Sequence, residues 1–229
     1  MKIAVVTSSY GLDIPYPNEF IYESADYFLF TNSKYYISEN NENLNVIHSP
    51  IYTISNRFEN RRSAKVFKII PEYFIPNYDV YIWHDITHTL KQDPKQLVKK
   101  YLKENDYAIF QHEFRDCLFE EAKFVKKLAY DDKKLVSRQM SFYRSLKHPY
   151  NSGLYELSSY IKNNNEKTKE FSIKWFEQIS KFSSRDQISF AFLIYNLKMK
   201  YSLLPGFVNG KDKNEIFKQV FFSDHPRTE

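Results

Sequence analysis

The sequence feature that most constrains the fold is the segment 81–90, YIWHDITHTL. An apolar run stops abruptly at His84 and Asp85, and a polar stretch follows. This pattern predicts a buried strand over 79–83 with an acidic residue at its carboxyl end. In open α/β sheets, ligands bind outside the carboxyl ends of the strands. Asp85 is therefore the first candidate for a functional side chain, although a solvated aspartate at an ordinary strand end gives the same pattern.

Short apolar runs alternate with segments of helical spacing along the rest of the chain. Predicted strands cover 2–7, 27–31, 44–48, 79–83, 107–111 and 154–161. Predicted helices cover 58–70, 94–102, 118–129, 132–146, 166–182 and 185–199. Asp93 is the predicted N-cap of the second helix and Ser183-Ser184 of the last, and the chain after 203 is predicted to be irregular. This alternation predicts a single α/β domain over 1–229 with a mainly parallel central sheet and a helical C-terminal third.

The composition limits the classes of protein that remain. Only 4 glycines accompany 20 phenylalanines and 19 tyrosines, which excludes low-complexity disorder and disfavours folds built on glycine-rich loops. The single cysteine, Cys117, excludes an intramolecular disulfide and a multi-cysteine zinc site, and it is expected to be buried. No apolar run approaches the ~18 residues of a membrane span, and the apolar start is too short for a signal peptide. A cytoplasmic protein is therefore expected.

The formal net charge of +5 is small for a chain with 33 basic and 28 acidic residues. Because the cations are dispersed among acids, a nucleic-acid partner is not expected. The charge suits an enzyme that acts on anionic substrates. Peripheral contact with the inner face of a membrane is left open.

Two polar clusters precede the Asp85 segment. The first is the small-residue loop TSSYG at 7–11, where a nucleotide can approach the backbone, although the glycine-rich phosphate motifs are missing. The second consists of the cations Arg57, Arg61, Arg62 and Lys65. Arg61 and Lys65 lie four residues apart and so share a helix face, which suits a diphosphate. A solvated basic helix face is the competing explanation.

Two further clusters carry carboxylates. Asp85 lies close to His84 and His88, and a carboxylate beside diphosphate oxygens suits Mg²⁺ or Mn²⁺. Each histidine is as readily explained by packing. The last cluster is SRDQ at 184–187, where Asp186 either favours a helix N-terminus electrostatically or meets a substrate. Because Asp85 and His112 both follow apolar strands, they are expected to open onto one cleft.

Several longer motifs occur in a fixed order along the chain. They are VTSSYG at 6–11, FTN at 30–32, RRSAKVFKIIPEYFIPNYDVYIWHDITHTLKQDP at 61–94, FQHEFRDCLFEEA at 110–122, Gln139 with Tyr143, and SSRDQISF at 183–190. This order resembles a glycosyltransferase-A-fold family long filed as a domain of unknown function, whose plant members include proteins once described as ceramidases and proteins linked to mucilage polysaccharide. The string H-x-x-R-x-C-x-x-E-E-A is the most specific match, because α/β periodicity alone does not generate it.

The resemblance implies a glycosyltransferase-A-like domain that moves a sugar from a nucleotide-sugar donor to a glycan, lipid or other acceptor. It implies a Mn²⁺ or Mg²⁺ ion at Asp85, which stabilises the departing diphosphate. The implied catalytic residues are Asp186, His112 and Arg115. The implied donor-binding residues are Thr7, Ser8, Tyr10, Asn32, Arg61, Arg62, Lys65 and Gln187.

Two other classes of protein stay open. A noncatalytic carbohydrate- or nucleic-acid-binding module would expose its aromatic side chains in a basic stripe. Another phosphate-handling enzyme, such as a nucleotidyltransferase, would require a second carboxylate close to Asp85.

Overall fold

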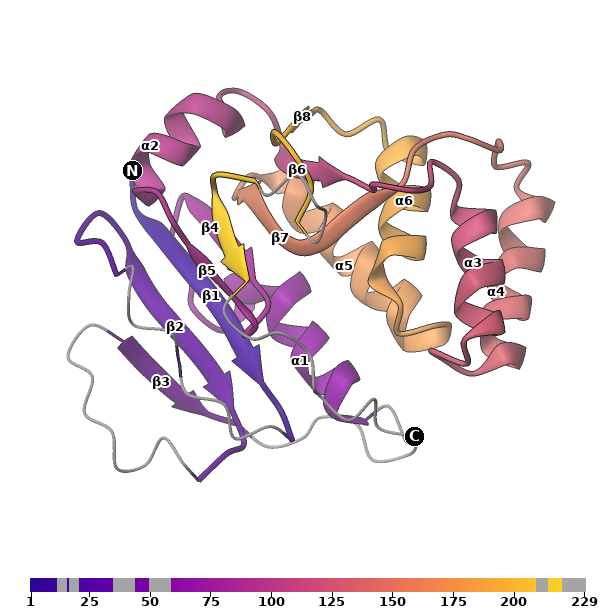
Figure 1. Cartoon of the computed structure of the whole chain (residues 1–229), viewed down its shortest axis with the longest axis horizontal. Helices are drawn as coiled ribbons and strands as arrows, with labels where there is room; N and C mark the ends of the chain where they lie inside the picture. The colour runs from indigo at the N-terminus through magenta and orange to yellow at the C-terminus, as the bar shows by residue number, and fades with distance from the viewer. Residues whose placement is uncertain (12–15, 17–20, 35–43, 50–58, 209–213, 220–229) are drawn as a thin grey trace.

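The architecture is given by a computed structural model that describes the chain except for residues 12–15, 17–20, 35–43, 50–58, 209–213 and 220–229. Within the described residues, one seven-stranded sheet is covered by helices on both faces (Figure 1). The strands of this sheet are β1 Ile3–Ser9, β2 Asp26–Thr31, β3 Leu44–His48, β4 Val80–His84, β6 Tyr107–Gln111, β7 Tyr155–Asn163 and β8 Tyr201–Leu203. A second, two-stranded sheet pairs β5 His88–Leu90 with β9 Phe217–Gln219.

The large sheet has the strand order β3-β2-β1-β4-β7-β6-β8. Neighbouring strands are parallel except at β7, which runs antiparallel to both β4 and β6. The predicted α/β class with a mainly parallel sheet is therefore confirmed. Since β7 runs against its neighbours, its first residues lie at the edge where β4 and β6 end.

This edge of the sheet brings together the polar residues that follow β4 and β6. The Asp85 amide donates a hydrogen bond to the Ser158 carbonyl at 2.7 Å, and the His112 amide donates one to the Leu154 carbonyl at 3.0 Å. Both acceptors belong to the first part of β7 or directly precede it. Asp85 and His112 thus lie at one edge, on either side of β7.

The helices form two layers that sandwich the sheet. They are α1 Glu59–Ile69, α2 Pro94–Leu97 with the π-helical turn η4 Val98–Leu102, α3 Leu118–Lys127, α4 Lys133–Ser145, α5 Glu166–Lys181 and α6 Asp186–Asn196, and a short 3₁₀ turn, η3, covers Pro71–Tyr73. Alternate residues of β1 serve the two faces: Ala4 and Val6 join the core under α1, α5 and α6, whereas Ile3 and Val5 join the core beneath α2 and η4. None of the described helices has the length and apolarity to cross a bilayer.

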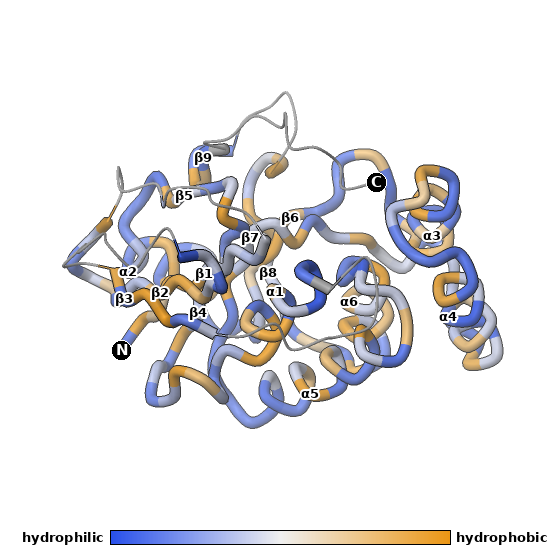
Figure 2. The backbone as a smooth tube through the Cα atoms, turned by 90° about the horizontal axis from the view of Figure 1, so that it is seen from below, coloured by the Kyte–Doolittle hydropathy of each residue, from blue (hydrophilic) through white to orange (hydrophobic). Residues whose placement is uncertain are grey.

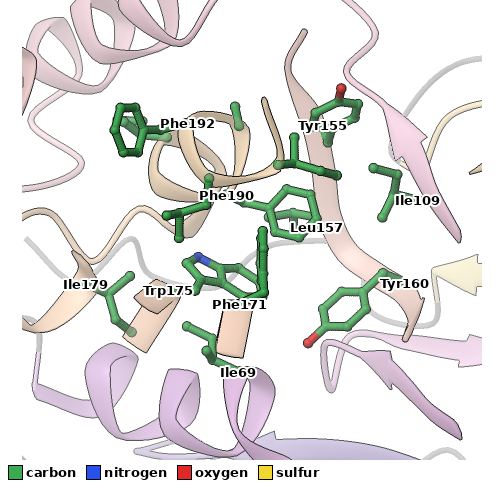
Figure 3. Close-up of a cluster of buried hydrophobic side chains, with 14 of the residues drawn as sticks. Ile69, Ile109, Tyr155, Leu157, Tyr160, Phe171, Trp175, Ile179, Phe190 and Phe192 are labelled. Atoms are coloured by element: carbon green, nitrogen blue, oxygen red, sulfur yellow. The ribbon is translucent and has the colours of Figure 1, made fainter. Parts of the chain in front are cut away.

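Aromatic side chains fill the larger of the two cores (Figure 3). The Trp175 ring lies 4.9 Å from the Phe190 ring and 5.9 Å from the Phe171 ring, both in edge-to-face contact. Such pairs add roughly 0.5–1.5 kcal/mol each beyond the burial of their area. Phe171 and Phe190 also contact the Tyr107 ring of β6, so this cluster joins α5 and α6 to the sheet, and α6 is buried on nearly all sides.

The predicted elements recur with shifted ends, and three short strands were missed. β1 continues to Ser9, so Thr7 and Ser8 belong to a strand and not to a loop. The strands β5, β8 and β9 have three residues each, too few to display a period of two, so the prediction of an irregular segment after 203 was wrong at β9. The Asp93 side chain does cap α2, accepting a hydrogen bond from the Gln96 amide at 3.0 Å.

The predicted capping of α6 by Ser183-Ser184 was also wrong. The N-cap residue is Arg185, and no side-chain cap occurs there among the described residues. The hydroxyls of Ser183 and Ser184 instead donate to Asp131 Oδ2 at 2.8 and 2.7 Å, and the Ser184 amide donates to the same oxygen at 2.6 Å. The two serines therefore tie the start of α6 to the connection between α3 and α4.

Asp131 is fully buried, whereas its neighbour Asp132 is exposed at the N-cap of α4. Asp131→Asn should lower the free energy of unfolding by about 3 kcal/mol, because both carboxylate oxygens accept hydrogen bonds, Oδ1 from the Asp132 amide at 2.7 Å, and the NH₂ group of asparagine would face donors at one of the two positions. Asp132→Ala should cost only ~1 kcal/mol, the usual effect of losing a cap. Urea denaturation followed by circular dichroism measures both variants, and an equal loss in the two would contradict the structural role of Asp131.

Candidate active site

A compact cluster of charges lies at the carboxyl edge of the parallel strands. Lys65 Nζ and Lys68 Nζ, both from α1, approach Asp186 Oδ2 at 2.6 and 2.7 Å. Lys68 Nζ also lies 3.6 Å from Oδ1 of Asp85, the residue that follows β4. The Lys68 side chain is only 1% exposed, the Lys65 side chain 14% and the Asp85 side chain 38%. A ligand can therefore reach Asp85 and Lys65, while Lys68 lies behind them.

Local sequence explains how this cluster forms. Lys65 and Lys68 are three residues apart on α1, so both side chains leave the same face of the helix. Asp186 is the first residue of α6, where a carboxylate also meets the positive end of the helix dipole. The Trp83 indole donates a hydrogen bond to Asp85 Oδ1 at 2.9 Å, which fixes the carboxylate.

The cluster keeps both carboxylates ionised. Burial alone would raise the pKa of Asp186, but the ammonium groups of Lys65 and Lys68 outweigh it and hold that pKa well below its usual range. Burial likewise opposes the charged form of Asp85, yet Lys68 and then Lys65 lower its pKa. Burial lowers the pKa of Lys65 to about 8 despite its contact with Asp186. Two cations and two anions thus balance one another.

A second polar network surrounds Glu121, which is 1% exposed. The Arg115 guanidinium donates to Glu121 Oε2 at 2.8 Å, and an Arg185 nitrogen lies 3.9 Å from Oε1. His112 Nδ1 accepts hydrogen bonds from the backbone amides of Phe114 and Arg115 at 3.1 and 3.2 Å. Burial, with the charges of Arg115 and Arg185, lowers the pKa of His112 to about 4, so the imidazole is neutral at physiological pH.

The first turn of α6 and the residue before it connect the two networks. Arg185 approaches Glu121, and Asp186 binds the lysines of α1. The Gln187 amide donates to the Tyr155 carbonyl at the start of β7, at 3.2 Å, and accepts from Arg185 at 3.1 Å. The predicted residues Asp85, Asp186, Gln187, Arg115 and His112 therefore lie in two polar networks that meet through the backbone at residues 185–187.

The residues predicted to hold the nucleoside occupy the ends of β1 and β2. Ser8 is buried in β1 and donates to the Ala64 carbonyl of α1 at 3.3 Å, and Thr7 is fully buried. The Tyr10 ring is buried and stacks on Phe67 at 5.8 Å. Asn32 is exposed and accepts a hydrogen bond from the Gly11 amide at 3.1 Å. The strand ends thus meet, but Thr7 offers a ligand no accessible side chain.

The predicted diphosphate cations have different environments. The Arg62 guanidinium donates to the carbonyls of Ile179 and Phe182 at the end of α5, with a distance of 2.8 Å for the second. Arg61 donates to the Tyr130 carbonyl at 2.6 Å. Arg57 lies outside the described residues. Arg62 is thus committed to the packing of α1 against α5, and Lys65 is the member of this set that joins the cluster with Asp186.

The surroundings of Asp85 bear on its predicted metal role. No group of three or more His, Cys, Asp or Glu side chains among the described residues is arranged to hold a metal ion. Asp85 Oδ1 already accepts the Trp83 indole N–H and lies beside the Lys68 ammonium. Mg²⁺ and Mn²⁺ prefer about six oxygen ligands and would face the charge of Lys68 here. The metal role of Asp85 stays a prediction.

Three participants were not foreseen from the sequence. Lys68 is not among the cations selected from the sequence, although its spacing of three from Lys65 is a usable signal. Glu121 belongs to the E-E-A string, and Arg185 precedes Asp186 directly. The burial of Glu121 could not be deduced, because it depends on how α3 and α6 pack together.

Comparison with known proteins fits this architecture. Residues 28–221 match the family described as TOD1/MUCI70, glycosyltransferase-like domain. The chain is 28% identical over 156 residues to the probable hexosyltransferase MUCI70 of Arabidopsis thaliana, an alignment that covers 64% of this chain and 26% of the plant protein. The apo structure of the bifunctional glycosyltransferase WbbM aligns with a TM-score of 0.55 at 12% identity, covering 89% of this chain and 39% of WbbM.

The chain thus spans well under half the length of these two relatives. The likeness to WbbM extends over nearly all of the sheet and its helices, and the fold is of the glycosyltransferase-A type that the motifs implied. Because the family match covers most of the sequence, this chain belongs to the TOD1/MUCI70 family of glycosyltransferase-like domains.

Proposed function

We propose that this chain is a glycosyltransferase that moves a sugar from a nucleotide-sugar donor to a glycan or lipid-linked acceptor. The observation that carries the proposal is the cluster of Lys65, Lys68, Asp85 and Asp186 at the carboxyl edge of the sheet. Membership of a glycosyltransferase-like family supports it. Ligands bind at this edge in open α/β folds.

The cluster has the charges that glycosyl transfer requires. The bond between the anomeric carbon and the diphosphate breaks, so negative charge develops on the leaving group and positive charge on the sugar ring. Fixed charges in a water-poor site stabilise such a transition state without reorganisation. Lys65, the more accessible of the two lysines, offsets the diphosphate charge, and Lys68 holds Asp186 in place from behind.

Asp186 acts by orienting and stabilising the sugar. A carboxylate whose pKa is held far below its usual range is a weak base, which disfavours proton abstraction from an acceptor hydroxyl. Its permanent negative charge instead favours a sugar ring that becomes positive. An orienting role for Asp186, which requires no proton transfer, is therefore favoured over a role as general base.

The acceptor side lies at the network around Glu121. A hollow of about 480 Å³ is lined by Phe114, Arg115, Asp116, Glu120, Lys123, Phe124 and Lys127. Phe114 is 75% exposed, which leaves an aromatic face for a sugar ring, and Arg115 connects the hollow to His112. This arrangement supports an acceptor that enters beside α3.

The rival classes find less support. A binding module would expose most of its aromatic side chains, whereas the large aromatic cluster of the described residues is buried. A nucleotidyltransferase needs a second carboxylate near Asp85, and Asp186 does lie close. However, the Lys68 ammonium contacts both carboxylates, which favours charge balance over a shared metal.

Donor binding is the first test. A panel of nucleoside diphosphates and nucleotide sugars should include one that raises the melting temperature, because a ligand that binds only the folded state stabilises it. Lys65→Met should lower the affinity for that ligand by about tenfold or more, since a charge-assisted contact is lost. Lys169→Met, which removes an exposed lysine paired with Glu166, is the matched control and should not change the affinity.

The metal prediction is decided in the same titration. If Asp85 holds Mn²⁺, added Mn²⁺ tightens diphosphate binding to the wild type and not to Asp85→Asn. An equal response of both proteins, or none, removes Asp85 from the metal role. Absence of any stabilising donor in the whole panel would contradict the proposed function itself.

The affinity for the nucleoside diphosphate should depend on pH through Lys65. Its pKa is lowered to about 8, so the ammonium is charged below that pH and loses its charge above it. Binding should therefore weaken as the pH rises through about 8. Calorimetric titration from pH 6 to 10 would measure the dissociation constant, which can rise by at most about tenfold per pH unit when one proton is lost. Lys65→Met should flatten this dependence. A profile identical in both proteins would assign the titration to another group.

The role of Asp186 is tested by separating charge balance from catalysis. Asp186→Asn alone leaves two buried ammonium groups short of a partner and should lower the free energy of unfolding by about 3 kcal/mol. The double variant Asp186→Asn/Lys65→Met restores the balance and should recover part of that loss. Turnover of both variants should fall by about a hundredfold or more. If the folded double variant turned over as fast as Lys65→Met alone, Asp186 would have no role at the sugar.

A further inference from the structure

The net positive charge of this chain is concentrated in one helical hairpin. The segment 118–147, which contains α3 and α4, holds eight Lys and Arg residues against four acids, a net of +4 out of the +5 of the whole chain. The cations are Lys123, Lys126, Lys127, Lys133, Lys134, Arg138, Arg144 and Lys147. All of them are exposed except Lys126, which is half-buried.

The four acids of the hairpin offset little of this charge at the surface. Glu121 and Asp131 are buried and accept hydrogen bonds from Arg115 and from the serines before α6. Glu120 is paired with Lys123 at 2.7 Å, and Asp132 caps α4 by accepting from the amides of residues 134 and 135. The outer surface of the hairpin is therefore strongly positive.

Apolar side chains lie among these cations. Phe142 is 40% exposed and Leu146 51% exposed, and a spacing of four residues places them on the same side of α4. Leu128, at the end of α3, is 39% exposed. Exposed leucine and phenylalanine surrounded by lysines are typical of protein segments that rest in the headgroup region of a bilayer.

The hairpin is also accessible. Figures 1 and 2 place α3 and α4 together at one end of the molecule, at the opposite end from α2, β2 and β3. The main contact of the hairpin with the remainder of the fold is between α3 and α6. Many residues of both helices are exposed, and the hydropathy colouring shows hydrophilic and hydrophobic residues mixed along them (Figure 2).

We propose that the α3–α4 hairpin docks this protein onto an anionic lipid bilayer. Lysines near such a surface are attracted by its negative potential, and their stems cover apolar area while their charges stay in water. Phe142 and Leu146 add a hydrophobic contact that a nucleic-acid backbone would not use. A bilayer therefore explains both kinds of side chain, whereas nucleic acid explains only the cations.

Docking would also orient the hollow beside Arg115. Lys123 and Lys127 of the hairpin line this hollow, together with Phe114. With α3 against the lipid, the hollow faces the headgroup region, where the sugar of a lipid-linked acceptor lies. The docking itself does not depend on glycosyl transfer, so its failure and the failure of the proposed function are separate results.

The test is co-sedimentation of the full chain with vesicles of phosphatidylcholine alone or mixed with phosphatidylglycerol. The wild type should bind the mixed vesicles and not the neutral ones. The triple variant Lys127→Gln/Lys133→Gln/Lys134→Gln should bind the mixed vesicles with a partition coefficient about a hundredfold lower, because each lost cation lowers it by about fivefold. The matched control Lys95→Gln/Lys99→Gln/Lys100→Gln removes three exposed lysines at the opposite end and has the same net charge, and it should bind like the wild type.

The apolar contribution to vesicle binding is tested with a second pair of variants. Leu146→Gln should weaken vesicle binding severalfold, whereas Leu203→Gln, at a residue of β8 that is 49% exposed, should not. Circular dichroism confirms that the variants are folded. Equal losses in the two triple variants, or no vesicle binding by the wild type, would overturn the proposal. So would tight binding to duplex DNA that responds to the hairpin lysines but not to Leu146→Gln, which would assign the surface to nucleic acid.

Discussion

The buried ammonium group of Lys68 is the interaction on which the arrangement of the site depends. It lies 2.7 Å from Asp186 and 3.6 Å from Asp85, and its side chain is 1% exposed. A buried charge that loses its partner costs several kcal/mol, so α1, the end of β4 and the start of α6 must meet at this point for the fold to be stable. A similar contact lies deeper, where Lys162 of β7 donates to Glu72 and Ser172 at 2.7 Å each.

This charge balance also governs how the site responds to a ligand. The cluster of Lys65, Lys68, Asp85 and Asp186 carries no net charge, so an anion entering from solvent gains little from the cluster as a whole. It gains by competing with Asp186 for Lys65, the lysine that remains partly accessible. Under the proposed function, a donor that loosens this contact would exchange one carboxylate partner of Lys65 for its diphosphate and leave the Asp186 carboxylate directed at the sugar. Donor binding and orientation of the sugar would then be coupled through one ammonium group.

Periodicity and strand-end chemistry were sufficient to predict the α/β class, most strands, and the position of Asp85 and His112 at one edge of the sheet, whereas the role of Asp186 came only from the resemblance. These signals are local, or follow from the shared direction of parallel strands. The misses have a different origin. Arg62 and Lys65 are both cations of the same predicted helix. In the structure Arg62 binds carbonyls at the end of α5, whereas Lys65 joins the charge cluster. Ser183 and Ser184 bind Asp131 because of tertiary contacts between segments more than 50 residues apart, which no local pattern encodes.

The antiparallel strand β7 has a consequence for how the chain reaches this structure. It is the only element that joins β4 to β6 within the described sheet, so the two parts of the sheet share no direct strand pairing without it. During synthesis, strands β1 to β4 leave the ribosome long before residues 155–163, and their edge at β4 stays open until then. Pairings over such sequence distances form late and slowly. Throughout that interval β4 presents an unpaired, apolar strand edge, the kind of surface that chaperones cover and that other chains can extend.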